Sequence, residues 1–303
     1  MLLTYVLVTP ARNEAHLIEL TLRSVVEQTV RPLKWVIVSD GSTDGTDEIV
    51  QKYAAVHSWI QLVRMPERAE RHFAGKVLAF NAGYDTVANL DFDVVANLDA
   101  DVSFENDYFS YLLGKLSEDS RLGLVGTPFQ EGSAATYDYR FTSIAHVSGA
   151  CQVFRRECFE QIGGYKPVKG GCIDHIAVIS ARMRGWRTRT FTERVCQHHR
   201  PMGTAQHGLL AARFKNGQKD YAIGNHPLWE FLRAVYQTTK KPFLIGGVML
   251  VAGYVWSAFT GKERPVSRDL IVFYRHEQMQ RLKALIMRRH RMAQTNESAP
   301  IAY

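Results

Sequence analysis

Short runs of apolar, often β-branched residues alternate with stretches of helical periodicity over the first 127 residues. The runs predict strands at residues 4–8, 35–39, 60–64, 94–98 and 122–125. Apolar residues recur at helical spacing within 18–29, 48–56 and 77–87, which predicts helices between the strands. We therefore expect an α/β fold with a mostly parallel, Rossmann-like sheet and right-handed crossovers.

After residue 127 the pattern becomes irregular and is marked by glycines. A helix is predicted at 174–184 and a strand at 187–191. We expect the stretch 128–240 to form the second side of a cleft, because no linker separates it from the first half. The predicted organisation is one domain over 1–240, followed by a helical C-terminal region over 241–303.

The C-terminal region begins with an apolar segment, residues 243–259, that carries no charge over 17 positions. This length is at the lower limit for a membrane span. Its three glycines weaken a soluble helix, and Tyr254 and Trp256 are residue types found at bilayer interfaces. A buried core helix is the alternative. We favour an in-plane or re-entrant segment, because a single crossing would export the basic tail that follows.

The net charge of +7 is unevenly distributed. The first hundred residues are close to balanced, whereas basic residues accumulate after residue 260. A basic tail beside an apolar segment favours a membrane surface as partner and not nucleic acid. Because the N-terminal residues do not resemble a secretory signal, we expect the protein at the cytoplasmic face of a membrane, with its four cysteines as reduced thiols.

Polar segments follow three predicted strands, at residues 9–14, 40–44 and 99–101. The carboxyl ends of parallel strands share one edge of a sheet, and ligands bind there. The spacing of Asp99 and Asp101 aligns their side chains at such a strand end. Two close carboxylates repel unless a cation neutralises them, so the pair predicts a divalent metal site for Mg²⁺ or Mn²⁺. Two solvated turn aspartates are the alternative.

Asp40 ends the second predicted strand, in the sequence SDGSTDGT. The residues after it are good turn and helix-cap types, so the turn itself requires no ligand. The turn also lacks the Gly-Lys-Ser/Thr ending of a P-loop. Asp40 is not explained by the turn, and a carboxylate at this edge can accept a hydrogen bond from a nucleobase N–H.

Four motifs, VTPARNE, WVIVSDGSTDGT, GKVLAFNAG and NLDADV, occur in an order and spacing that resemble the family 2 glycosyltransferases of the GT-A fold. The resemblance implies that Asp40 reads the base of a nucleoside-diphosphate sugar. It implies that Asp99 faces the ribose or a divalent metal, Mn²⁺ or Mg²⁺, and that Asp101 ligates this metal. It also implies that the nucleotide is surrounded by Pro10, Ala11, Arg12, Glu14, Lys76 and Asn81.

The resemblance continues through SGACQVFRRECFEQIGGY and GGCIDHIAVISARMRGW. The second segment contains the helix predicted at 174–184. Many family members begin this helix with Glu-Asp, and the aspartate serves as general base; here the pair is Ile173-Asp174. Asp174 is thus the implied base, and a helix N-cap is the alternative for this residue. The two roles conflict, because a base needs an oxygen free within about 3 Å of the acceptor hydroxyl.

His198, His199 and Arg200 follow the last predicted strand. Imidazole can complete a metal shell, and a guanidinium can bind a diphosphate through two N–H groups. A histidine in this stretch is a metal ligand in some relatives, so His198 and His199 are both candidates, and Arg200 is a candidate for donor binding. A solvated loop is the alternative.

These features predict an inverting, metal-dependent glycosyltransferase that moves a sugar from a nucleoside diphosphate to a hydroxyl acceptor, lipid-linked or part of a cell-surface glycan. The nucleotide would bind to residues 1–127 and the acceptor to 128–240. A sugar-1-phosphate nucleotidyltransferase is disfavoured, because TPARNE has no glycine-rich nucleotide loop. A catalytically silent, membrane-associated nucleotide-binding protein is the other alternative.

Overall fold

The computed structural model describes residues 3–67, 73–132, 134–135, 143–200, 208–241 and 243–297. The chain divides into two compact units, Met1–Met202 and Gly203–Tyr303, and each is described by itself. All the predicted site residues belong to the first unit.

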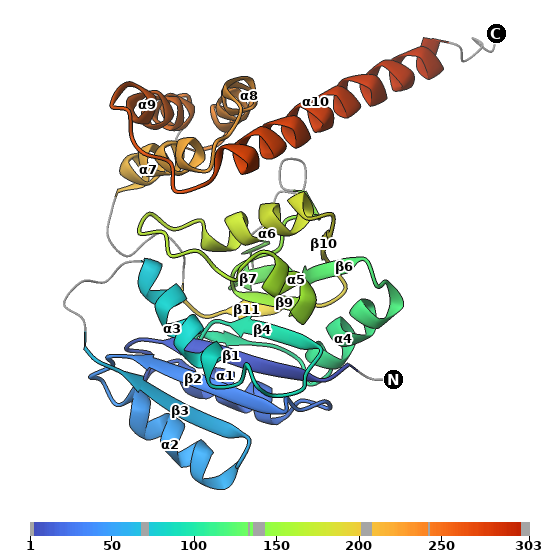
Figure 1. The fold of residues 1–303 in the computed structure, drawn as a ribbon. Helices are drawn as coiled ribbons and strands as arrows, with labels where there is room; N and C mark the ends of the chain where they lie inside the picture. Colours follow the sequence, from blue (N-terminus) through green and yellow to red (C-terminus); the bar gives the residue numbers. More distant parts are fainter. Residues whose placement is uncertain are drawn as a thin grey trace. The chain divides into compact units, whose positions relative to one another are not determined.

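A seven-stranded sheet lies at the centre of the first unit (Figure 1), in the order β10-β6-β9-β4-β1-β2-β3. Neighbouring strands are parallel except on both sides of β9, which is antiparallel to β4 and β6. The strands are β1 (Tyr5–Ala11), β2 (Lys34–Asp40), β3 (Ile60–Met65), β4 (Val94–Leu98), β6 (Leu122–Gly126), β9 (Cys151–Arg155) and β10 (Arg187–Thr190). The predicted mostly parallel sheet is therefore confirmed.

Strand side chains point alternately to the two faces of the sheet and build one core on each face. Leu7 and Ile37 belong to the core that α1, α2 and α4 cover, whereas Val6 and Val36 belong to the core beneath α3, α5 and α6. The helices are α1 (Ile18–Val26), α2 (Thr46–Val56), α3 (Phe73–Asp85), α4 (Tyr108–Glu118), α5 (Arg156–Gln161) and α6 (Ile173–Met183). The three predicted crossover helices thus form, the first ending at Val26.

Strand β9 lies in the region where the sequence predicted no regular element. It enters the sheet between β4 and β6 and runs against both. Gly126 makes room for it, since a Cβ atom there would lie 2.7 Å from the Cys151 carbonyl oxygen. As a result, residues Gly149 and Ala150 arrive next to the end of β4, where the backbone N–H of Asp99 donates to the Ala150 carbonyl over 2.9 Å.

A second, four-stranded sheet lies beside the end of β4, in the order β5-β11-β7-β8. Its strands are β5 (Val102–Ser103), β11 (Cys196–His198), β7 (Phe129–Glu131) and β8 (Ala134–Ala135). Strand β11 pairs with β5 so that His198 is opposite Val102. This small sheet brings the segment after residue 195 next to the Asp99-Ala100-Asp101 turn.

The second unit contains four helices in the part of it that the structure describes: α7 (Leu209–Ala222), α8 (Pro227–Gln237), α9 (Ile245–Phe259) and α10 (Arg268–Glu297). Helices α7 and α9 cross at two glycines. A Cβ atom at Gly217 would lie 1.9 Å from the Leu250 carbonyl oxygen, and one at Gly253 would lie 2.0 Å from that of Phe214. The backbones are in direct contact, which explains why glycines interrupt this apolar segment.

The division between compact units differs from the boundary that the sequence predicted at residue 240. Because α7 packs on α9, residues from Leu209 onward belong with the C-terminal helices. The compact units concern packing alone. A division at residue 240 between a catalytic part and a membrane-associated part stays a prediction. No helix among the described residues is both long enough and apolar enough to span a membrane.

A buried ion cluster connects α7 and α8. Arg233 pairs with Asp220, and its guanidinium also lies 3.9 Å from the Glu230 carboxylate. Asn225 donates to the same carboxylate over 3.0 Å. Burial and the neighbouring Asp220 charge raise the pKa of Glu230 to about 7. Arg233 is therefore engaged inside the unit.

We expect Gly253→Ala to lower the stability of the protein, because the added methyl group would overlap the Phe214 carbonyl oxygen. Overpacking of this kind costs about 1–3 kcal/mol. Gly114→Ala is the matched control: it is also a helix position, with no atom within 4 Å of the added Cβ, and should gain about 0.5–1 kcal/mol. Thermal unfolding followed by circular dichroism measures both, and equal effects would contradict the glycine contact.

Candidate active site

The ends of β4, β1 and β2 lie side by side and place the three predicted polar segments at one edge of the sheet. Asp99 directly follows β4. Pro10 and Ala11 are the last residues of β1, and Asp40 is the last of β2. The shared edge that the sequence analysis predicted is therefore present.

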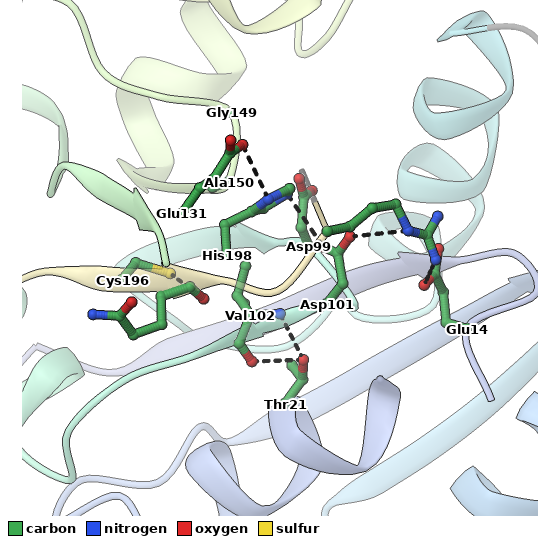
Figure 2. A network of polar contacts seen from close by, with 12 residues as sticks. Glu14, Thr21, Asp99, Asp101, Val102, Glu131, Gly149, Ala150, Cys196 and His198 are labelled. Carbon is green, nitrogen blue, oxygen red and sulfur yellow. Dashed lines mark hydrogen bonds and ion pairs between the residues drawn. The ribbon is translucent and has the colours of Figure 1, made fainter. Parts of the chain in front are cut away.

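Asp99, Asp101 and His198 form a cluster at this edge (Figure 2), with one possible ligand atom from each lying within 4.8 Å of the others. His198 Nε2 lies 3.5 Å from Asp101 Oδ1. Two carboxylate oxygens and one imidazole nitrogen are a donor set that suits Mn²⁺, whereas Mg²⁺ prefers oxygen alone. The residues present therefore fit the divalent ion that the sequence predicts.

The second nitrogen of His198 supports this fit. Its Nδ1 atom is buried and makes no hydrogen bond, and lies 3.6 Å from Glu131 Oε1. A metal-bound histidine usually directs its other ring nitrogen to a carboxylate, which orients the ring and raises its basicity. Glu131, on β7, holds the position of such a partner.

Cations lie on both sides of the carboxylate pair. The Lys76 ammonium, in the first turn of α3, pairs with Asp99, and it lies 3.4 Å from the Gly149 carbonyl oxygen. On the other side the Arg200 guanidinium pairs with Glu14 and lies 3.8 Å from Asp101 Oδ2. Figure 2 shows Asp101 between His198 and the guanidinium that is joined to Glu14.

Burial and neighbouring charges shift the pKa values in this cluster in opposite directions. Burial raises the pKa of Asp99, and the ammonium of Lys76 counteracts it. Burial alone would lower the pKa of Lys76, but the nearby carboxylates of Asp99, Asp174 and Asp101 outweigh it and raise that pKa. Lys76 is therefore a permanent positive charge at the site.

Asp40 is almost completely buried at the end of β2. Its carboxylate lies 3.8 Å from the Arg12 guanidinium. The chain turns away directly after it at Gly41, where φ is +66° and a Cβ atom would lie 2.5 Å from the Glu67 Cα atom. Only glycine fits there, and the turn leaves Asp40 facing Arg12 at the edge of the sheet.

The loops after β1 and β2 are joined to each other by hydrogen bonds. The Asn13 N–H donates to Ser42 Oγ over 3.1 Å, and the Glu14 N–H donates to Thr46 Oγ1 over 2.8 Å. Ser42 and Thr46 follow Asp40 in the stretch that the sequence analysis attributed to a turn and a helix cap, and they also hold the two loops together. The loop of Arg12 and that of Asp40 form one surface.

Asp174 lies in the first turn of α6, opposite Lys76 across Gly149. The N-cap of this helix is Cys172, so the N-cap alternative for Asp174 is wrong. A Cβ atom at Gly149 would lie 3.2 Å from Asp174 Oδ2, while the Gly149 carbonyl accepts from the side chains of Lys76 and Asn97. A side chain at position 149 would press against the Asp174 side chain, so glycine leaves room for the carboxylate where it lies.

Two histidines that the sequence analysis did not select lie next to Asp174. The rings of His146 and His175 are 5.0 Å apart. Burial lowers the pKa of His146, against the opposing charge of Asp174. Glu131 and His146 were missed, because the segments that carry them were not predicted and no motif surrounds them. Gly149 lies in the segment SGACQVFRRECFEQIGGY, but the sequence analysis gave it no role in the site.

The structure separates the two candidate histidines. His198 is in the cluster, whereas His199 Nε2 is bonded to Ser103 Oγ over 2.8 Å, and its backbone N–H donates to the Asp101 carbonyl. Asn81 lies on α3, five positions after Lys76, and is half-buried. The roles of all these residues stay predictions.

Residues 6–182, more than half of the chain, match the family Glycosyl transferase family 2. The chain belongs to this family. The match ends within α6, so it includes Asp99, Asp101 and Asp174, while His198 and Arg200 lie beyond it. This membership makes the protein a glycosyltransferase.

Solved structures share the fold of this family 2 chain. The mannosyltransferase PcManGT from Pyrobaculum calidifontis, in complex with GDP-Man and Mn²⁺, is 20% identical, with a TM-score of 0.61 over 87% of this chain and 89% of that one. TarS 1-349 from S. aureus, in complex with UDP-GlcNAc, is 13% identical, with a TM-score of 0.53 over 85% and 73%. The predicted GT-A fold is thereby confirmed.

One curated relative is the putative teichuronic acid biosynthesis glycosyltransferase TuaG of Bacillus subtilis (strain 168). It is 37% identical over 62 residues, which are 20% of this chain and 25% of the relative. The match thus spans only a quarter of that protein's length.

We expect His198→Ala to weaken Mn²⁺ binding at least tenfold, because it removes one of three ligand atoms and even outer-shell losses cost roughly 10- to 100-fold. His199→Ala is the matched control, since its ring is bonded to Ser103 outside the cluster. Electron paramagnetic resonance titration of free Mn²⁺ measures both affinities. An equal loss in the two variants would show that His198 is not a ligand.

Proposed function

We propose that this family 2 glycosyltransferase transfers a sugar from a nucleoside-diphosphate sugar to a hydroxyl acceptor, depends on a divalent metal and inverts the anomeric centre. The observation that carries the proposal is the Asp99, Asp101 and His198 cluster at the sheet edge, next to the loop surface of Arg12 and Asp40. PcManGT in complex with GDP-Man and Mn²⁺ supports the same combination of donor and ion.

The nucleoside would bind at the ends of β1 and β2. A carboxylate that is nearly buried and fixed, as Asp40 is, can accept one or two base N–H groups at little entropic cost. Pro10, Ala11 and Arg12 would form the wall on the β1 side. Glu14 would line the pocket beside them, and its carboxylate also holds Arg200.

A divalent ion on Asp99, Asp101 and His198 would act as a Lewis acid on the departing diphosphate. The chain adds two fixed positive charges to the same place. Arg200 is held by Glu14 and keeps further guanidinium N–H groups for phosphate oxygens. Lys76 stays protonated, because the surrounding carboxylates raise its pKa. Both would stabilise the negative charge that develops as the bond to the diphosphate breaks.

Asp174 would serve as general base. Its carboxylate is half-buried in the first turn of α6, next to Gly149 and within electrostatic reach of Lys76. It would take the proton of the acceptor hydroxyl while that oxygen bonds to the anomeric carbon and the bond to the diphosphate breaks. One displacement from the opposite side inverts the configuration at that carbon.

The acceptor would be a lipid-linked or cell-surface glycan. Support comes from TuaG, whose name places it in teichuronic acid biosynthesis.

A thermal-shift screen of UDP-, dTDP- and GDP-sugars, with and without Mn²⁺, tests the proposal. We expect one donor class to raise the melting temperature only when Mn²⁺ is present, and Asp101→Asn to abolish this shift while the apoprotein melts as the wild type does. Incubation with an acceptor then tests turnover. Binding without any product in hydrolysis or transfer assays would favour the silent nucleotide-binding alternative.

We expect Asp174→Asn to lower the rate of transfer by about 10²- to 10⁴-fold, the usual contribution of a general base. Donor and Mn²⁺ affinities should stay unchanged, because Asp174 is outside the metal cluster. Asp85→Asn, at an exposed position at the end of α3, is the control. Steady-state kinetics and proton NMR of the product's anomeric centre supply the rate and the stereochemistry. Wild-type turnover in Asp174→Asn, or retention of configuration, would contradict the mechanism.

A further inference from the structure

Helix α8 carries an exposed apolar stripe on the surface of the second unit. The stripe consists of Leu228, Phe231, Leu232 and Val235, which recur at helical spacing and are all exposed. The other side of α8 is used inside the unit, where Glu230 and Ala234 are buried. The stripe is therefore a face that the packing of the described part of this unit leaves uncovered.

Helix α9 carries a second exposed apolar stripe. Ile245, Val248, Trp256 and Phe259 are exposed, the last at 88% of its full surface. The opposite side of the same helix packs against α7 through Leu250 and Gly253 and against α8 through Gly247, whose added Cβ would lie 2.5 Å from the Ala234 carbonyl oxygen. Exposure thus runs along the length of α9 and is limited to one side.

The connection between the helices joins the two stripes. Phe243 and Leu244 are exposed, and the Leu244 N–H donates to the carbonyl of Thr238 at the end of α8 over 3.0 Å. We call the two stripes with this connection the α8–α9 face. Exposed apolar side chains gathered on two helices that pack on each other mark an interaction site.

The charges next to this face are net positive. Glu230 and Arg233 belong to the ion cluster inside the unit, so the remaining charges between residues 227 and 263 are Lys240, Lys241, Lys262 and Glu263, three positive and one negative. Lys240 and Lys241 follow α8 after two threonines, and Lys262 lies three positions after the end of α9, so the lysines stand near the ends of the stripes. An apolar strip with lysines at its ends is complementary to a surface that is apolar inside and anionic at its rim.

We propose that the α8–α9 face binds side-on to an anionic lipid surface, with the apolar stripes inserted among the acyl chains and the lysines at the headgroups. Trp256 lies in the stripe and is the residue type that prefers the bilayer interface. A second copy of the chain fits the face less well, because two copies joined face to face would bring their lysines together. The proposal concerns the second unit and is independent of the proposed chemistry in the first.

Flotation of the full-length protein with phosphatidylglycerol vesicles and with phosphatidylcholine vesicles tests the proposal. We expect binding to the anionic vesicles, weakening with added salt. Phe231→Glu/Val248→Glu should lower the affinity at least tenfold, because both side chains are exposed in the stripes. Leu33→Glu/Val56→Glu is the matched control, since these two side chains are exposed in the first unit, and it should bind as the wild type does.

Two further measurements separate the contribution of the lysine charges from the insertion of the apolar stripes. Lys240→Gln/Lys241→Gln should weaken binding to the anionic vesicles by about fivefold for each lysine that contacts the surface. Tryptophan fluorescence should shift to shorter wavelength on binding, and Trp256→Phe should lose the shift while it still floats with the vesicles.

The proposal is overturned if the wild type does not bind, or if both double variants bind equally. It is also overturned if analytical ultracentrifugation finds a dimer that Phe231→Glu/Val248→Glu dissociates while vesicle binding persists. Transfer to a soluble acceptor, measured on the same variants, should be unchanged. A loss of vesicle binding is thereby distinguished from a failure of the catalytic proposal.

Discussion

Repulsion between two carboxylates held close together is the constraint on which the organisation of the first unit depends. Asp99 and Asp101 lie at a largely buried sheet edge, where one oxygen of each lies within 4.8 Å of the other and little water screens the repulsion between them. Positive groups from distant segments converge on them: Lys76 from α3, and Arg200 from the segment after β11. The same arrangement suits a divalent ion, whose positive charge the two carboxylates would balance. It also suits a diphosphate, whose negative charge Lys76 and Arg200 would balance.

Much of this edge could be predicted from the sequence because it depends on local patterns. A buried parallel strand is a short apolar run, and the polar residue that follows it must lie at the carboxyl edge, so Asp40, Asp99 and Asp101 were placed together. The order of strands in the sheet is not local. Strand β9 is five residues long, and one of its two neighbours, β4, lies 50 or more residues away from it in the sequence. No periodicity along the chain could therefore indicate that β9 separates β4 from β6.

The choice between His198 and His199 shows the same limit at the level of one residue. In a strand, adjacent side chains point to opposite sides, so the register of β11 against β5 decides which ring faces the carboxylates. That register depends on pairing between segments almost a hundred residues apart. Similarly, the glycines of α9 suggested tolerance in lipid, whereas they also allow the backbone of α7 to approach, which only the packed structure reveals.

The pairing of β11 with β5 would also couple binding of the proposed metal ion to local folding. Strand β11 has three residues, and it meets β5 over two of them and β7 over two, so each of these pairings rests on few hydrogen bonds. An ion shared by His198 and the carboxylates after β4 would join β11 to the central sheet, and opening of the strand would then require release of the ion. A bound ion would therefore add to the free energy of opening of this segment, and amide hydrogen exchange around residue 198 would slow as the ion binds.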